Sequence, residues 1–364
     1  MKKIALLLVV LLLAGTFAFA GGGGQASSGF RADVFWYTFA DTYLASVRNA
    51  MDEQASGTAV NLTHHDCQEN QALQTQMVQT AITQGTRLLI VNIVTTAAED
   101  AAMNIANMAR TANIPIIFFN REVSDAVIRS YANAAFVGTD ANEAGYLQGE
   151  AIANFLLRPA NWTGNRSNFD LNGDGIIRYV MLRGEHGNAE AFGRTLYSVQ
   201  EANDRLSGRL RLQPSAANET STQYPNDGVS NFFLMANWSA ATAANLMRTA
   251  LTAHSLTNGA IELIIANNDD AAIGAIEALR ERGYNTGSGN FIPTFGVDAT
   301  AVAQENIRAG RMTATVMQDA VGMARVVLEL AQNIAGGRAL MAGTASYNID
   351  AGVNKIRVPY AIFE

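Results

Sequence analysis

The chain has 364 residues, of which 49% are hydrophobic, and its 32 acidic and 25 basic side chains give a net charge of −7. A chain of this length exceeds what one hydrophobic core usually covers, so two domains are expected. The acidic balance argues against nucleic-acid binding, and the single cysteine, Cys67, excludes an intrachain disulfide.

The first twenty residues have the features of an export signal. Two lysines precede an apolar run at 4–14, and Ala18-Phe19-Ala20 has the small-x-small pattern of signal-peptidase cleavage. The run is too short to span a membrane, and the glycines that follow open a flexible leader at 21–30. We therefore expect a signal peptide at 1–20, cleavage after Ala20 and a soluble periplasmic product.

Beyond the leader, strand and helix signals alternate. Short apolar runs predict strands at 33–38, 58–63, 88–93, 114–119, 134–137, 176–182, 209–212, 263–266, 291–297, 312–317 and 353–360. Periodicity and capping signals predict helices after Asp41 and at 68–83, 97–111, 140–157, 190–203, 238–253, 270–282, 301–309 and 323–334. The polar tract 215–231 is predicted to be a loop. The alternation predicts an α/β fold in which parallel sheets are flanked by helices, twice over.

Polar side chains follow the apolar runs in both halves, at the predicted carboxyl ends of strands, where parallel sheets bind ligands. They are Asp41, Asn120, Glu190, Arg194, Asn268, Asp298 and Gln318. Any one of them could be a turn former or helix cap, but the recurrence favours a shared polar cleft. Carboxylates accept hydrogen bonds from hydroxyl groups and arginine donates in a fork, which suits a hydroxyl-rich ligand. Tyr43 and Trp238 could cover the apolar face of a sugar ring, or could simply pack.

The run D-L-N-G-D-G at 170–175 has the oxygen spacing of a calcium loop. The predicted ligands are Asp170, Asn172, Asp174 and the carbonyl of Ile176. Arg178, at the ninth position, cannot ligate, and Met181 stands where the bidentate acid usually lies. An ion-free loop closed by Asx turns is the alternative.

Five runs then carry a resemblance. They are I-P-I-I-F-F-N-R-E, F-V-G-T-D-A-N-E-A-G, F-D-L-N-G-D-G, L-I-I-A-N-N-D and P-T-F-G-V-D-A. With these motifs in order, the chain resembles the bacterial periplasmic D-galactose/D-glucose-binding proteins, of the type I periplasmic sugar-binding family, from about 33 to 360. The resemblance implies two similar lobes that are joined by three crossovers and close on one monosaccharide without chemistry.

The resemblance also implies lobe boundaries and site residues. The amino-terminal lobe would comprise 31–138 and 320–356, and the carboxyl-terminal lobe 139–319 and 357–364. The implied sugar-binding residues are Asp41, Tyr43, Asn120, Asn188, Glu190, Arg194, Trp238, Asn268, Asp298 and Gln318, and Glu262 would complete the calcium site. Tyr43, Asn188, Glu190 and Gln318 stand where the family has phenylalanine, histidine, aspartate and asparagine, which leaves the exact sugar open.

We therefore predict a monomeric, non-enzymatic binding protein of an ABC sugar importer that binds glucose, galactose or both. Its partners would be the membrane permease and, as a further option, a chemoreceptor, and it would hold a structural calcium ion. The alternatives are a binding protein for another sugar such as a pentose, or a glycoside-processing enzyme, which would need paired acids at a defined separation. A sugar-responsive repressor would need a helix-turn-helix where this chain has its export signal.

Overall fold

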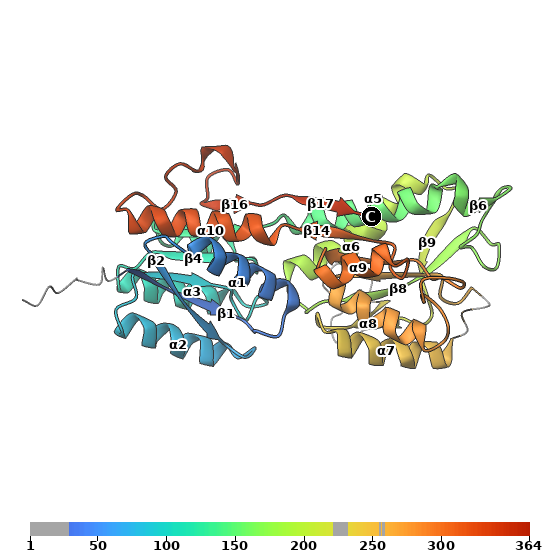
Figure 1. Cartoon of the computed structure of the whole chain (residues 1–364), viewed down its shortest axis with the longest axis horizontal. Coiled ribbons are helices and arrows are strands. Elements are labelled where there is room, and N and C mark those ends of the chain that lie inside the picture. The colour runs from blue at the N-terminus through green and yellow to red at the C-terminus, as the bar shows by residue number, and fades with distance from the viewer. Residues whose placement is uncertain (1–28, 221–231, 255, 257–258) are drawn as a thin grey trace, which may run out of the picture.

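The computed structural model describes residues 29–220, 232–254, 256 and 259–364. The predicted signal peptide, nearly all of the leader and part of the predicted loop 215–231 lie outside the described residues. The described residues form two α/β lobes that lie next to each other along the longest axis (Figure 1). Each lobe contains a mostly parallel sheet flanked by helices, which confirms the predicted fold class.

The first lobe is built on a seven-stranded sheet of order β15-β16-β5-β4-β3-β1-β2, in which only β15 pairs antiparallel. The strands are β1 (Phe30–Trp36), β2 (Val60–Asp66), β3 (Leu88–Val91), β4 (Ile116–Phe119), β5 (Ala134–Gly138), β15 (Asn348–Ile349) and β16 (Lys355–Arg357). The helices of this lobe are α1 (Thr42–Ala55), α2 (Gln71–Thr83), α3 (Glu99–Thr111), α4 (Asp125–Arg129) and α10 (Ala320–Ala335). β1 begins at the last residue of the predicted leader.

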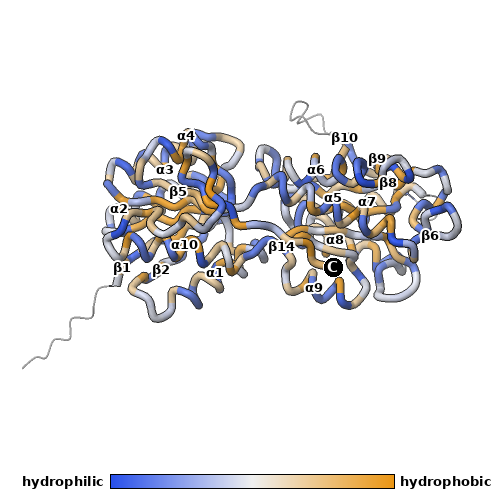
Figure 2. Tube along the Cα trace, turned by 90° about the horizontal axis from the view of Figure 1, so that it is seen from above, coloured by the Kyte–Doolittle hydropathy of each residue, from blue (hydrophilic) through white to orange (hydrophobic). Residues whose placement is uncertain are grey.

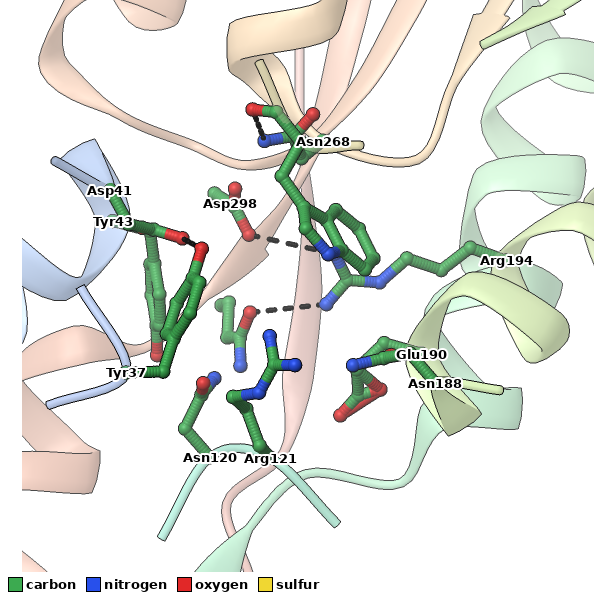
Figure 3. A pocket seen from close by; sticks show the side chains of 12 residues that line it. Tyr37, Asp41, Tyr43, Asn120, Arg121, Asn188, Glu190, Arg194, Asn268 and Asp298 are labelled. Atoms are coloured by element: carbon green, nitrogen blue, oxygen red, sulfur yellow. Dashed lines mark hydrogen bonds and ion pairs between the residues drawn. The ribbon is translucent and has the colours of Figure 1, made fainter. Parts of the chain in front are cut away.

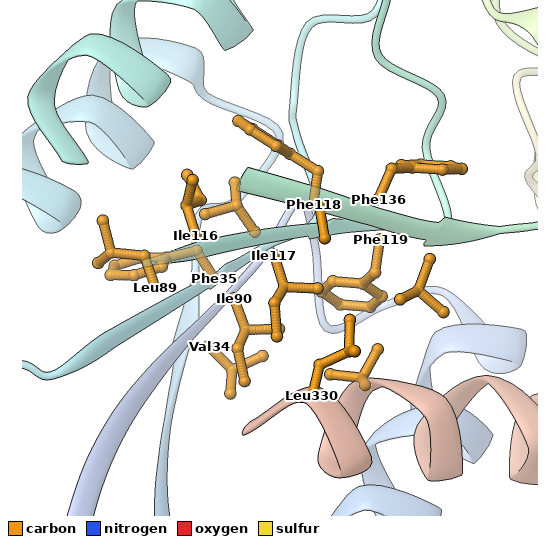
Figure 4. Close-up of a cluster of buried hydrophobic side chains, with 14 of the residues drawn as sticks. Val34, Phe35, Leu89, Ile90, Ile116, Ile117, Phe118, Phe119, Phe136 and Leu330 are labelled. Carbon is orange, nitrogen blue, oxygen red and sulfur yellow. The ribbon is translucent and has the colours of Figure 1, made fainter. Parts of the chain in front are cut away.

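The core of this lobe explains why its central strands are continuous apolar runs. Every residue of β3 and β4 is buried, because helices cover both faces of the sheet. Successive strand residues point to opposite faces, so Phe118 and Phe119 project to opposite sides, with Phe119 toward Leu330 of α10 (Figure 4). Apolar stretches run through the middle of both lobes (Figure 2).

The second lobe is built on an eight-stranded sheet of order β10-β11-β8-β12-β13-β14-β17, in which β9 also pairs with β8. Its strands are β8 (Ile176–Arg183), β9 (Arg211–Pro214), β10 (Glu219–Thr220), β11 (Phe232–Met235), β12 (Leu263–Ala266), β13 (Thr294–Asp298), β14 (Ala314–Gln318) and β17 (Tyr360–Phe363). Its helices are α5 (Ala141–Leu157), α6 (Ala189–Leu206), α7 (Ala240–Ala253), α8 (Asp269–Arg280) and α9 (Ala301–Arg308). A two-stranded ribbon, β6 (Trp162–Thr163) and β7 (Arg166–Ser167), precedes β8. None of the helices in the described ranges is both long and apolar enough to cross a membrane.

The chain passes between the two lobes after β5, after β14 and between β16 and β17 (Figure 1). The prediction of one strand at 353–360 was therefore wrong. The structure divides it into β16, which pairs with β5 of the first sheet, and β17, which pairs with β14 of the second.

Close helix packing places α6 at one of these passages. A Cβ atom added to Gly193 of α6 would lie 2.5 Å from the carbonyl oxygen of Ala141, the first residue of α5. Only glycine allows the two helices to approach so closely at this point. Glu190 and Arg194, on the first turns of α6, are thereby held next to the segment that leaves β5.

Candidate functional site

A cavity between the two lobes is lined by twelve residues and measures about 380 Å³ when the open space at its mouth is counted (Figure 3). They are Tyr37, Asp41, Tyr43, Asn120, Arg121, Asn188, Glu190, Arg194, Trp238, Asn268, Asp298 and Gln318. All ten residues predicted from the sequence to bind sugar are among them, and Tyr37 and Arg121 are additions. A concave site with several convergent polar groups and aromatic rings is typical of small-molecule sites.

Three of the lining residues are also helix N-caps. Asp41 caps α1, Asn188 caps α6 and Asn268 caps α8, and each accepts a hydrogen bond at 2.9–3.1 Å from the backbone N–H three residues on. The two roles considered for these residues, helix cap and cleft residue, therefore do not exclude each other, because each side chain caps a helix and also lines the cavity. Three helices begin at the cavity, where their dipoles favour hydrogen-bond acceptors of a ligand.

The backbone is strained at three other lining residues. Asn120, Trp238 and Asp298 have φ angles of 59°, 66° and 123°, in the region that favours glycine. Such conformations cost about 1–3 kcal/mol each and persist where the surrounding structure imposes them, often at functional sites. This strain independently marks the cavity as a functional site.

Arg194 is held firmly in the wall of the cavity. Its Nη1 atom donates to the carbonyl of Asn267 at 2.8 Å, and its Nη2 atom donates to Gln318 Oε1 at 3.1 Å and to the Tyr360 hydroxyl at 2.9 Å. Asp298 Oδ1 lies 3.8 Å from Nη1 (Figure 3). Hydrogen bonds within the protein thus fix the orientation of the guanidinium.

Two hydroxyl groups connect this guanidinium to Glu190. The Tyr360 hydroxyl lies 2.8 Å from Thr139 Oγ1, which lies 3.1 Å from Glu190 Oε1. Thr139 has one hydroxyl hydrogen and donates it to Glu190 Oε1, so Tyr360 donates to Thr139 and accepts from Arg194. Thr139 follows β5 and Tyr360 opens β17, so residues of two inter-lobe passages orient charged groups of the cavity.

Burial perturbs the carboxyl groups of the cavity. It raises the pKa of Glu190 to about 7, although the charge of Arg194 opposes this. Burial likewise raises the pKa of Asp298 well above its ordinary value, again against Arg194 and with the help of neighbouring acids such as Asp269. The hydrogen bond from Thr139 and the charge of Arg194 lower the pKa of Glu190 by less than burial raises it.

Several buried polar atoms at the cavity have no hydrogen-bond partner among the described residues. They are Glu190 Oε2, Arg194 Nε, Trp238 Nε1, Gln318 Nε2 and Arg121 Nε. A buried polar atom left unpaired costs about 1–3 kcal/mol, so such atoms are rare in native proteins. One acceptor and four donors, concentrated at one cavity, indicate a ligand that carries both donors and acceptors.

Tyr37 and Arg121 were missed in the sequence although both adjoin features noted there. Tyr37 directly follows β1 and donates a hydrogen bond to Asp41 Oδ2 at 2.9 Å. Arg121 directly follows Asn120, and its guanidinium lies 4.2 Å from the centre of the Tyr37 ring. It also pairs with Glu185 of the other lobe, so this ion pair connects the two lobes beside the cavity.

Two buried asparagines support the cavity in equivalent ways in the two lobes. Asn92, after β3, donates to Asn120 Oδ1 at 3.0 Å and accepts from the backbone N–H of Tyr37 at 3.2 Å. Asn267, after β12, accepts from the backbone N–H of Gly184 at 3.0 Å, and its carbonyl holds Arg194. Each asparagine directly follows a buried apolar strand, which is the signal that could have identified it.

The predicted calcium ligands lie in the loop before β8. Asp170, Asn172 and Asp174 surround its turn, Ile176 begins β8, and Glu262 approaches from the segment before β12. All carboxylate oxygens of the three acids already accept hydrogen bonds from backbone or side-chain donors. In the described part of the chain no group of three His, Cys, Asp or Glu side chains is arranged to hold a metal. The guanidinium of Arg178, which donates to Asp174, disfavours a cation at this loop.

Comparison with known proteins agrees with this architecture. The periplasmic binding protein domain matches residues 32–339. The D-galactose/methyl-galactoside binding periplasmic protein of Haemophilus influenzae is 33% identical, over 99% of this chain and 96% of its own. The ribose import binding protein of Escherichia coli is 24% identical, over 96% and 97%. The solved structure of a carbohydrate transporter solute binding protein from Chloroflexus aurantiacus with D-glucose superposes with a TM-score of 0.69 at 19% identity, over 92% of each chain.

Proposed function

Because the chain belongs to the periplasmic binding protein family, we propose that it binds D-galactose or D-glucose between its lobes and delivers the sugar to an ABC importer. Its curated relatives are solute-binding proteins, and the chain is a binding protein rather than an enzyme. The galactoside-binding relative, which covers nearly the whole chain, makes a hexose the first candidate.

The observation that carries the proposal is the cluster of unpaired polar atoms beside aromatic rings. Glu190 Oε2 can accept from a sugar hydroxyl, while Arg194 Nε and Gln318 Nε2 can donate to one. Trp238 and Tyr43 offer ring faces for the C–H groups of a pyranose. A ligand that satisfies these atoms recovers the cost of burying them unpaired.

A pentose is the second candidate. Glu190 and Gln318 are each one methylene longer than the aspartate and asparagine that the family resemblance implies at these positions. Both side chains line the cavity, so their extra length reduces the space for the hydroxymethyl group that distinguishes a hexose. The ribose-binding relative is compatible with this alternative.

A thermal-shift screen of the mature chain, followed by calorimetry, tests the proposal. D-Galactose, D-glucose, D-xylose, D-ribose and L-arabinose are each added, with methyl glycosides as a test for turnover. A ligand at one hundred times its Kd stabilises the folded state by about 2.7 kcal/mol, which a melting curve detects. One sugar should bind with 1:1 stoichiometry and without turnover, whereas hydrolysis of a glycoside would support an enzyme.

Further properties belong to the same proposal. We expect a monomer, export with cleavage after Ala20, docking to the permease and, as an option, to a chemoreceptor. We also propose hinges at the ends of the lobe segments 31–138, 139–319, 320–356 and 357–364. Light scattering gives the mass in solution, and the mass of the periplasmic protein gives the cleavage site.

A further inference from the structure

We propose that Arg178 and Arg166 supply the positive charge that a calcium ion would supply at this position, so that the loop before β8 closes without a metal ion. This inference concerns the stability of the second lobe and is independent of the sugar proposal.

The guanidinium of Arg178 lies against two of the predicted calcium ligands. Its Nη2 atom donates to Asp174 Oδ2 at 2.6 Å and its Nη1 atom to Asp174 Oδ1 at 3.3 Å, in a bidentate arrangement. The same Nη1 atom lies 4.0 Å from Glu262 Oε2. The cation is therefore placed between the acid of the turn and the acid that approaches from the distant segment.

The other carboxylate oxygens are taken by backbone amides. Asp170 Oδ1 accepts from the N–H of Gly173 at 2.7 Å, and Asp170 Oδ2 accepts from the N–H of Gly175 at 2.9 Å. Glu262 accepts from the N–H of Leu171 at 2.7 Å and from the N–H of Arg178 at 2.8 Å, one on each oxygen. These bonds connect the loop directly to the distant acid.

Arg166, on β7, binds the carbonyl oxygens of the loop. Its guanidinium donates to the carbonyl of Asp170 at 2.8 and 3.1 Å and to the carbonyl of Leu171 at 2.6 Å. Two loop carbonyls thus also have donors. A second guanidinium therefore lies at the same loop as the first.

The formal charges are consistent with two guanidinium groups in place of one calcium ion. Asp170, Asp174 and Glu262 contribute −3 and the two guanidinium groups +2, which leaves −1. Three carboxylates and one calcium ion would also leave −1. A calcium ion placed between Asp174 and Glu262 would meet the guanidinium of Arg178 at close range, and this like-charge repulsion opposes binding.

The test compares the wild-type protein with R178Q, in which an amide oxygen replaces the guanidinium at the ninth loop position. Melting temperatures are measured in chelator and in millimolar calcium chloride, and calorimetry records any heat of calcium binding. R129Q is the matched control, because Arg129 and Asp125 form an exposed ion pair with the same four-residue spacing on α4.

We expect the wild-type melting temperature to be the same in chelator and in calcium, with no heat of binding. R178Q should melt about 2–6 °C lower in chelator. Calcium should restore this loss, because the cation is gone and a new oxygen ligand is present. R129Q should remain near the wild-type value in both solutions.

Calcium heat or chelator-sensitive melting in the wild-type protein would overturn the proposal and support a calcium site. An R178Q variant as stable as R129Q in chelator would overturn the role of Arg178. An unstable R178Q variant that calcium does not restore would show that the guanidinium is not in the position of an ion. Sugar binding is not measured, so the outcome does not depend on the ligand.

Discussion

Replacing Glu190 by glutamine separates the charge of this side chain from its shape. The variant keeps an Oε1 acceptor for the Thr139 hydroxyl, which lies 3.1 Å from Glu190 Oε1. It removes a carboxyl group whose pKa is raised by burial from 4.5 to about 7. Stability and ligand affinity should therefore change in opposite directions.

The stability effect follows from the direction of the pKa shift. A carboxyl group with a higher pKa in the folded state favours folding when protonated, so its contribution is complete below pH 4.5 and is lost as the pH rises through 7. Each pKa unit corresponds to about 1.4 kcal/mol, so the ligand-free wild type loses up to about 3 kcal/mol by pH 8. E190Q avoids this loss and should melt several degrees higher than wild type at pH 8, with little difference at pH 4.

The ligand effect has the opposite sign. If Glu190 Oε2 accepts a hydrogen bond from a sugar hydroxyl, the ionised carboxylate is the binding form. The sugar affinity of the wild type should then decrease below about pH 7. E190Q should bind the sugar about 10- to 100-fold more weakly than the wild type at pH 8, because hydrogen bonds to charged groups contribute about 1.5–3 kcal/mol.

Melting curves and calorimetry at pH 4, 6 and 8 measure both effects. E53Q is the control, because Glu53 is an exposed carboxylate on α1. A variant that is no more stable than wild type at pH 8 would refute the raised pKa of Glu190. Equal sugar affinity at pH 8 would refute its contact with the ligand.

Two further substitutions test how the cavity is organised. Y360F removes the hydroxyl between Arg194 and Thr139. We expect calorimetry to show about a 10-fold loss of sugar affinity, with an unchanged circular dichroism spectrum. Wild-type affinity in Y360F would contradict the role of Tyr360 in positioning Arg194. G184A adds a Cβ atom 2.3 Å from the Trp238 ring, so the indole must move. The change in tryptophan fluorescence on adding sugar should therefore differ from that of the wild type. An unchanged fluorescence response would show that this ring does not contact the sugar.

The central strands and the site residues could be predicted because local signals encode them. Strands such as β3 and β4 are apolar throughout, since both faces of the sheet are covered. The cavity residues could be predicted because the carboxyl ends of parallel strands meet at one edge, and Asn120 and Asp298 stand directly at such ends.

Other features depend on distant partners or on very short segments. Helix α4 has only five residues, and β11 follows a polar tract and exposes Phe232, so neither has a strong periodic signal. The division between β16 and β17 depends on which sheet each strand joins, which an apolar run does not encode. Tyr360 acts through Arg194, which lies 166 positions away in the sequence, and no local pattern predicts such a contact.

Titration calorimetry of the mature protein with D-galactose and D-glucose, in parallel with D298N, tests the central claim most directly. Asparagine keeps the size and the branching of Asp298, so it adds no backbone strain at the φ angle of 123° and the variant should fold. D204N is the control, because Asp204 is exposed at the end of α6. We expect one sugar per wild-type or D204N molecule and binding at least about 100-fold weaker in D298N. Wild-type affinity in D298N would contradict the proposed cavity, and the absence of heat with both hexoses and with pentoses would contradict monosaccharide binding.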